Sequence, residues 1–270
     1  MFPEDRALYE KFDKEGLKIT GYPYAGDVYH QFAIDTAAQG LGGTGDTPLF
    51  GHSPDFGYFY FGIPWYGDEI WNGGRFTDYD KDGKFDDWEV FRWIDENRAG
   101  KGDFKDWTAY KHPQLGDVEI GGLNPKFYAQ NPPPDLGETW FRNEALWNLW
   151  MAEQLPQVRI TAATATPAKG APGIFDVTMT VTNEGLMPTA MEMAKRVKIV
   201  RPDTCIITLP KGVEIVKPFV GKVPQTAIEI DSIKPGETKT ATWQVKGSGT
   251  ATVAISSTRG GVDKREVTVQ

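Results

Sequence analysis

Cysteine and long apolar runs are scarce in this sequence. Cys205 is the one cysteine among 270 residues, which excludes an internal disulfide. It lies in the run Cys-Ile-Ile-Thr-Leu, which is typical of a buried strand residue rather than of a reactive thiol. No apolar stretch approaches the roughly 20 residues that a helix needs to cross a bilayer. The first residues also lack the basic region and apolar core of a secretory signal. We therefore expect no membrane span, and the compartment stays open.

An excess of positive charge is also missing. The formal net charge is -8 and the sequence pI is near 5.0. Nucleic acids and anionic membranes both require a basic surface, so neither is an expected partner. The glycine-rich residues 40–46 lack the Gly-Lys-Ser/Thr ending of a phosphate-binding loop, which argues against a nucleotide site.

The composition changes near Leu155 and Pro156. Eight of the nine tryptophans and all three histidines precede Pro156, whereas the remainder is rich in Thr, Val, Ile and turn residues. A chain of this length suits two domains, and we predict them at residues 1–155 and 156–270. The second part carries no histidine and only scattered acids, so we expect it to stabilise its neighbour or to mediate contacts.

The pattern after Pro156 has a period of two residues. Alternating runs include residues 175–182, 227–230, 240–245 and 251–255, and turn signals such as Lys234-Pro-Gly separate them. Short alternating strands punctuated in this way predict a β-sandwich with immunoglobulin-like or fibronectin-like topology.

Helical spacing occurs in the first part. Acidic residues after Pro3, apolar residues at three- and four-residue steps, and Gly16 predict a helix from Pro3 to about Glu15. Residues 28–38 form a second candidate. A third helix starts after the prolines at 132–134 and is stopped by Pro156. The tryptophans of this third helix recur at helical spacing, which favours core packing over a sugar-stacking platform.

The most specific chemical signal is an acidic loop at residues 78–89. Its residues match positions 1, 3, 5, 6, 9 and 12 of the twelve-residue calcium-binding pattern, in the order Asp78, Asp80, Asp82, Gly83, Asp86 and Glu89. A hard divalent cation needs six to eight oxygens, which the carboxylates and the Lys84 carbonyl would supply. An exit helix follows, but no entry helix precedes the loop. We therefore predict a structural calcium site; the alternative is a solvated acidic turn.

Glu69 is a candidate acid or base. If residues 62–71 form a strand, Trp65, Glu69 and Trp71 lie on one face, and desolvation among the aromatic rings would raise the pKa of Glu69. The alternative is an ordinary surface or paired carboxylate ahead of Asn72-Gly-Gly.

A family resemblance begins in the same segment. It is carried by residues 55–58, 61–63 and 67–71, with further similarity at 17–23, 28–32, 112–122, 131–133 and 181–189. These segments resemble the C-terminal half of M14-type zinc carboxypeptidases, bacterial members with a β-rich C-terminal domain in particular. The resemblance implies an α/β fold, namely part of the carboxypeptidase αβα domain with the calcium loop as an insertion. It also places Glu69 on the catalytic glutamate.

The family's zinc ligands are missing from this chain. The resemblance implies a zinc ion held by two histidines and a glutamate, the first pair spaced His-x-x-Glu, and none of His30, His52 and His112 begins that motif. No zinc ligand is therefore assigned here.

Two hypotheses follow. In the first, which the segment around Glu69 favours, the chain is the C-terminal part of a metallocarboxypeptidase, inactive alone, whose missing N-terminal half would complete it to act on peptide or protein substrates. In the second, it is a non-catalytic, calcium-stabilised protein that binds peptide or glycan or has a structural role. The family and the calcium loop both favour a secreted or periplasmic location, since calcium is millimolar outside the cytosol.

Overall fold

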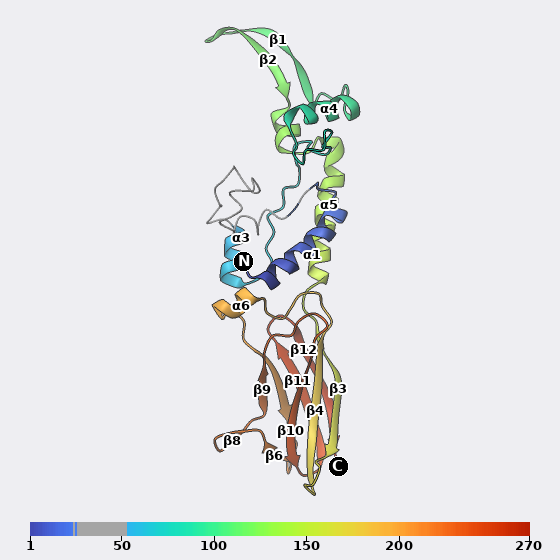
Figure 1. The fold of residues 1–270 in the computed structure, drawn as a ribbon, viewed down its shortest axis with the longest axis vertical. Coiled ribbons are helices and arrows are strands. Elements are labelled where there is room, and N and C mark those ends of the chain that lie inside the picture. Colours follow the sequence, from blue (N-terminus) through green and yellow to red (C-terminus); the bar gives the residue numbers. More distant parts are fainter. Residues whose placement is uncertain (24, 26–52) are drawn as a thin grey trace. The chain divides into compact units, whose positions relative to one another are not determined.

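The computed structural model describes residues 1–23, 25 and 53–270 (Figure 1). The predicted helix at 28–38, the glycine-rich residues 40–46, His30 and His52 lie outside these residues. Two compact units divide the chain: one comprises Met1–Leu8, Leu49–Trp65 and Met151–Gln270, the other Tyr9–Pro48 and Tyr66–Trp150. The described chain is mixed α/β with several antiparallel sheets, as the sequence predicts at this coarse level.

Helix α1 extends further than predicted, from Pro3 to Thr20. Gly16 does not end it, because this residue packs against Trp147, and a Cβ there would lie 3.3 Å from the indole. The helix ends instead at Gly21, whose φ of +75° suits a residue without a side chain. Glycine thus ends the helix as expected, but one turn later.

Helix α5, Pro134–Glu153, confirms the predicted third helix. Its buried stripe includes Trp147, which is 3% exposed. The Trp147 ring stacks on Trp150 at 5.3 Å and meets Phe12 of α1 edge-on at 6.4 Å. The tryptophans of this helix therefore pack, as their spacing predicts.

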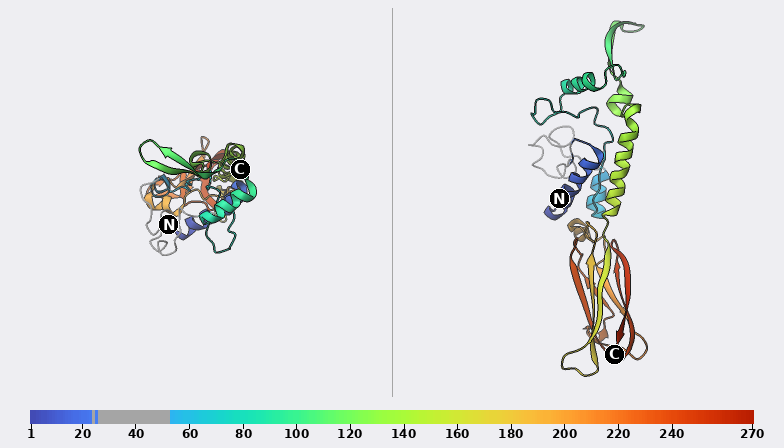
Figure 2. Two further views of the ribbon diagram at one scale, coloured as in Figure 1. Left: turned by 90° about the horizontal axis from the view of Figure 1, so that it is seen from above. Right: turned by 90° about the vertical axis from the view of Figure 1, so that its right-hand side faces the viewer.

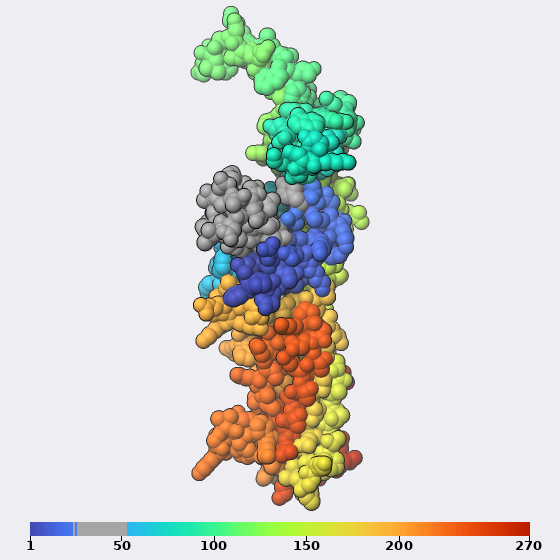
Figure 3. Space-filling view, viewed as in Figure 1, coloured from blue at the N-terminus to red at the C-terminus, as the bar shows by residue number. Residues whose placement is uncertain are grey.

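Four helical segments lie between these helices in the described residues. Three are short, α3 (Ser53–Asp55), η2 (Phe56–Phe61) and η3 (Pro125–Gln130), and the fourth is α4 (Asp87–Asn97). Among the described residues before Pro156, the strands are β1 (Phe104–His112) and β2 (Gly116–Leu123), an antiparallel hairpin. Figure 3 shows this hairpin standing clear of the helices of its own unit, and Trp107 on it is 60% exposed. The predicted strand through Glu69 is wrong, because residues 62–72 are irregular.

The sandwich predicted after Pro156 is present as two four-stranded antiparallel sheets (Figure 2). One has the order β3 (Val158–Pro167), β4 (Ile174–Asn183), β10 (Thr238–Lys246) and β6 (Glu214–Lys217). The other has the order β12 (Gly261–Val269), β11 (Gly249–Ser257), β5 (Asp203–Thr208) and β9 (Ala227–Ile230). A small ribbon, β7 (Phe219–Val220) and β8 (Val223–Pro224), completes the unit.

Alternate residues of these strands form the core between the two sheets. Trp243 of β10 and Val177 of β4 are fully buried from one side, and Ile255 of β11 from the other. Cys205 of β5 is also fully buried, and burial raises the pKa of its thiol to about 11. The prediction of a packing cysteine is therefore confirmed.

The sandwich unit also includes residues from the start of the chain. Asp5, 3% exposed, accepts hydrogen bonds from the Glu192 and Met193 amides at 2.8 and 3.0 Å, at the start of helix α6 (Glu192–Val197). Arg259 donates to the carbonyls of Phe61 and Gly62. A single boundary near Leu155 therefore does not describe this unit. None of the helices in the described part of the chain is long and apolar enough to span a membrane.

Candidate metal centre

The structure brings three of the predicted calcium ligands together. One carboxylate oxygen from each of Asp78, Asp80 and Asp82 lies within 4.8 Å of the other two. Oxygens that bind one calcium ion at about 2.4 Å can be no more than about 4.8 Å apart, so the spacing fits one ion. Among residues 1–23, 25 and 53–270, no other three His, Cys, Asp or Glu side chains gather this closely.

Backbone amides orient these carboxylates. Gly83 N–H donates to Asp78 Oδ2 at 2.9 Å, and Asp82 N–H lies 3.2 Å from an oxygen of both Asp78 and Asp80. Lys84 N–H donates to Asp82 Oδ1 at 2.8 Å. The turn depends on Gly83, whose φ is +84°. Hydrogen bonds within the loop therefore hold the three carboxylates close together.

The neighbouring negative charges change the pKa of Asp80. The amide of Asp82 lowers the pKa of Asp80, but desolvation and repulsion from Asp82, Glu89 and Asp78 together raise it above its ordinary value. A cation is the group that would relieve this repulsion.

Glu89 closes the loop from the first turn of α4. It is 3% exposed, and its two carboxylate oxygens accept hydrogen bonds from the amides of Tyr79 (2.5 Å) and Asp86 (3.0 Å). Position 12 of the pattern is thereby tied to positions 2 and 9. Neither Glu89 nor Asp86 belongs to the group of three aspartates, and the Lys84 ammonium lies 3.5 Å from Asp82 Oδ2.

Side chains also fix the loop on α4. The Arg92 guanidinium lies 4.1 Å from the centre of the Tyr79 ring, and the Tyr79 hydroxyl donates to Glu96 at 2.7 Å. Arg92 and Glu96 are themselves paired at 2.8 Å. The loop and its exit helix therefore form one local structure.

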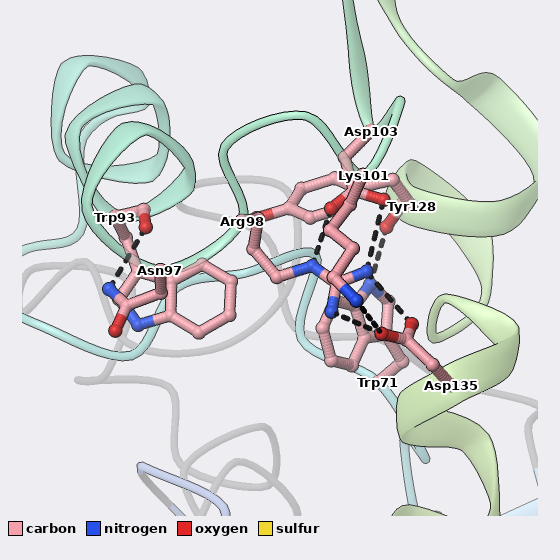
Figure 4. Close-up of polar contacts among 8 residues, drawn as sticks. All are labelled: Trp71, Trp93, Asn97, Arg98, Lys101, Asp103, Tyr128 and Asp135. Carbon is pink, nitrogen blue, oxygen red and sulfur yellow. Dashed lines mark hydrogen bonds and ion pairs between the residues drawn. The ribbon is translucent and has the colours of Figure 1, made fainter.

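The far end of α4 is anchored by a buried arginine (Figure 4). Arg98, 6% exposed, donates to Asp103 at 2.5 and 3.2 Å and to Asp135 at 3.0 and 2.9 Å. Asp103 precedes the hairpin, and Asp135 lies in the first turn of α5. In the same region, Trp71 donates its indole N–H to the Tyr128 carbonyl. The helix that follows the acidic loop is thus connected to the hairpin and α5.

Glu69 does not have the predicted surroundings. It is exposed in an irregular segment, so it is not enclosed by Trp65 and Trp71. The physical reason is that residues 62–72 form no strand, and the period-two argument fails there.

One other carboxylate, Glu144, has the buried environment predicted for Glu69. Burial, and then the charge of Asp68, raise the pKa of Glu144 to about 7. Asp68 itself is exposed, and partial desolvation raises its pKa against a lowering hydrogen bond from Trp147. Glu144 lies on the buried face of α5, three residues before Trp147. It was not among the predicted site residues, although a carboxylate at a core-facing position of a helix is a signal for a raised pKa.

His112 behaves as a structural residue. Its Nδ1 accepts hydrogen bonds from the amides of Gln114 and Leu115 at 3.2 and 3.1 Å, at the end of β1.

Comparison with known proteins finds one family model, which matches the second half of the chain, and distant structural similarities. A family model described as a domain of unknown function (DUF8731) matches residues 157–268. No curated protein matches. Similar solved structures include β-glucosidase 3B from Thermotoga neapolitana, with 16% identity, 43% of this chain and 16% of that chain covered, and a TM-score of 0.24. An α2-macroglobulin structure from Escherichia coli has 13% identity, the same coverages and a TM-score of 0.22. The chain thus spans a small part of these proteins, and similarity at this level carries no functional argument.

Proposed function

We propose that residues 78–89 bind one calcium ion and that the ion has a structural role. The observation that carries the proposal is the convergence of the Asp78, Asp80 and Asp82 oxygens within 4.8 Å, in a turn held by backbone hydrogen bonds. The sequence pattern assigns further oxygens to the Lys84 carbonyl and to Glu89. Calcium is favoured over magnesium because the ligand set is rich in protein oxygens and the pattern supplies a bidentate position.

The proposed ion would stabilise the region around α4. Charge neutralisation removes the repulsion among the aspartates, and the Tyr79 contacts connect the loop to Arg92 and Glu96. One loop with one helix has no paired partner against which to open, so the role is structural rather than that of a sensor.

The function that fits best is a calcium-stabilised, non-catalytic binding or structural protein. The described residues contain one metal-type cluster, and it consists of aspartates alone. The sandwich and the exposed hairpin offer surfaces for a peptide or a glycan. For the sandwich, the immunoglobulin-like or fibronectin-like topology is part of this proposal.

Thermal unfolding of the full chain with and without calcium tests the proposal. At about 100 times its Kd, a ligand specific for the folded state adds about 2.7 kcal/mol. We expect calcium to raise the Tm of the natural chain and to leave unchanged a variant carrying Asp78→Asn, Asp80→Asn and Asp82→Asn. The control is Asp95→Asn, which changes an exposed acid on the exit helix α4 and should respond to calcium like the natural chain. An equal calcium response in the triple variant would refute the assignment.

The carboxypeptidase hypothesis rests on the sequence resemblance. Its test is reconstitution with an N-terminal half that supplies the His-x-x-Glu motif and a further histidine. In that complex, Glu69→Gln should abolish release of C-terminal amino acids and leave the zinc content unchanged. Activity that survives Glu69→Gln would remove the proposed catalytic role of this residue.

A further inference from the structure

A cavity of about 540 Å³ opens in the sandwich unit, away from the acidic loop in sequence. It lies between the end of α6, the start of β5 and the end of β9. Small-molecule sites occupy about 300–1,000 Å³, so the cavity has a suitable size. All of its lining residues belong to one compact unit and to the stretch matched by the family model.

Part of the cavity lining is a polar group held by hydrogen bonds. Asp203 is 2% exposed, and Thr189, 1% exposed, donates its hydroxyl to Asp203 Oδ2 at 2.5 Å. The same Thr189 oxygen accepts from the Ile233 amide at 2.8 Å. Ser257 is a second hydrogen-bond partner of Asp203. Because its carboxylate is already engaged, Asp203 shapes the cavity rather than competing for its cations.

Three cationic side chains line the cavity, and two of them lack partners. Lys195 is paired with Glu192 at 2.8 Å. Lys198 and Arg201 are exposed, and their side chains make no ion pair or hydrogen bond within the described residues. Lys198 has a φ of +56° at the C-terminal end of α6, where the chain leaves the helix toward Arg201. The end of this helix thus presents two unneutralised cations to one cavity.

An adjacent part of the lining, at the end of β9, is acidic. It includes Glu229 and Asp231, and Asp231 Oδ1 accepts a hydrogen bond from the Ser232 amide at 2.7 Å. Glu229 and Asp231 therefore offer acceptors, whereas Lys198 and Arg201 offer donors. A ligand that satisfies both carries an oxyanion together with a hydroxyl or amine group.

We propose that this cavity binds a small polar molecule through an oxyanion, either a carboxylate or a phosphate, held by Lys198 and Arg201. Hydroxyl or amine groups of the same molecule donate to Glu229 and Asp231. Charge-assisted hydrogen bonds from a guanidinium and an ammonium are the strong contacts in such a site. The proposal does not depend on calcium, because no residue is shared with the acidic loop.

Chemical-shift titration of the full-length, ¹⁵N-labelled chain tests the site. The probes are inorganic phosphate, acetate, glucuronate and glucose 6-phosphate, with glucose as the neutral comparison. We expect saturable shifts at residues 189–203 and 229–232 for at least one sugar anion, tighter than for inorganic phosphate or acetate, and none for glucose. Whether glucuronate or glucose 6-phosphate binds more tightly distinguishes a carboxylate from a phosphate.

Variants with the same net charge distinguish binding in the cavity from nonspecific electrostatic attraction of the anion to the protein. Lys198→Gln with Arg201→Gln should weaken binding about tenfold, since two solvent-exposed charge pairs are lost and each is weak in water. Arg196→Gln with Lys222→Gln removes the same charge from exposed residues that do not line the cavity, and should change affinity less than twofold. If the double variant Lys198→Gln with Arg201→Gln does not fold, the two single variants are measured in its place. Absence of saturable shifts with every probe, or equal weakening in both double variants, would overturn the proposal.

Discussion

The Gly83 amide donates a hydrogen bond to Asp78 Oδ2 at 2.9 Å, and this contact closes the turn that gathers three carboxylates. Gly83 can occupy the turn because its φ of +84° costs a glycine little. The same turn creates the repulsion that raises the pKa of Asp80 after the lowering effect of the Asp82 amide. Loop geometry and charge thus both favour a cation at this position.

Glu89→Gln should destabilise the protein even without calcium. Both carboxylate oxygens of Glu89 accept backbone hydrogen bonds, and an amide would place an N–H group against one of these donors. Loss of such a buried bond costs about 1–3 kcal/mol. Urea unfolding in EDTA measures the difference. Asp95→Asn is the control, and equal midpoints for Glu89→Gln and the natural chain would contradict the closing role of Glu89.

Glu144 should make stability depend on pH. Its pKa of about 7 in the folded state exceeds the unfolded value of about 4.3, so the folded state binds more protons between these values. Stability contributed by the protonated group is therefore lost as pH rises from about 4.3 through 7. Burial is the main cause, with Asp68 second.

The variant Glu144→Gln isolates this effect. It should match the natural chain near pH 4 and exceed it by about 3–4 kcal/mol at pH 8, because each of the roughly 2.7 pKa units between the folded and unfolded values corresponds to about 1.4 kcal/mol. Denaturant unfolding at both pH values measures the difference. Glu138→Gln, an exposed position on α5, should show no such dependence. A constant difference between Glu144→Gln and the natural chain across this range would argue against the raised pKa.

Asp5→Ala should unfold the sandwich unit more easily. The change leaves the amides of Glu192 and Met193 and the hydroxyl of Tyr58 without their acceptor. We expect a loss of about 2–3 kcal/mol in the free energy of unfolding. Glu4→Ala, its exposed neighbour, is the control. In an Asp5→Ala background, Tyr58→Phe should cost less than it does alone; purely additive effects would mean that the two side chains are not coupled.

Sequence patterns correctly predicted those elements whose structure depends on residues close together in the sequence. The alternation in the second half identified the two sheets, and the spacing around Trp147 identified α5, because each pattern reflects one buried face. The calcium motif placed three aspartates that do converge, since a twelve-residue turn is specified by its own glycine and acids.

Long-range contacts were not accessible in this way. The hydrogen bonds from the α6 amides to Asp5 join residues 187 and 188 positions apart, and no local pattern marks them. Glu69 was assigned from an assumed strand, whereas the enclosed carboxylate proved to be Glu144. Its burial depends on tertiary packing, which periodicity does not encode.

Metal content tests the central claim most directly. The full chain is brought to equilibrium by dialysis against millimolar calcium together with zinc, and both compartments are analysed by elemental mass spectrometry. The account predicts one calcium ion per chain, no zinc, and loss of the calcium in the variant with asparagine at positions 78, 80 and 82. Equal calcium inside and outside the bag, or stoichiometric zinc, would contradict it.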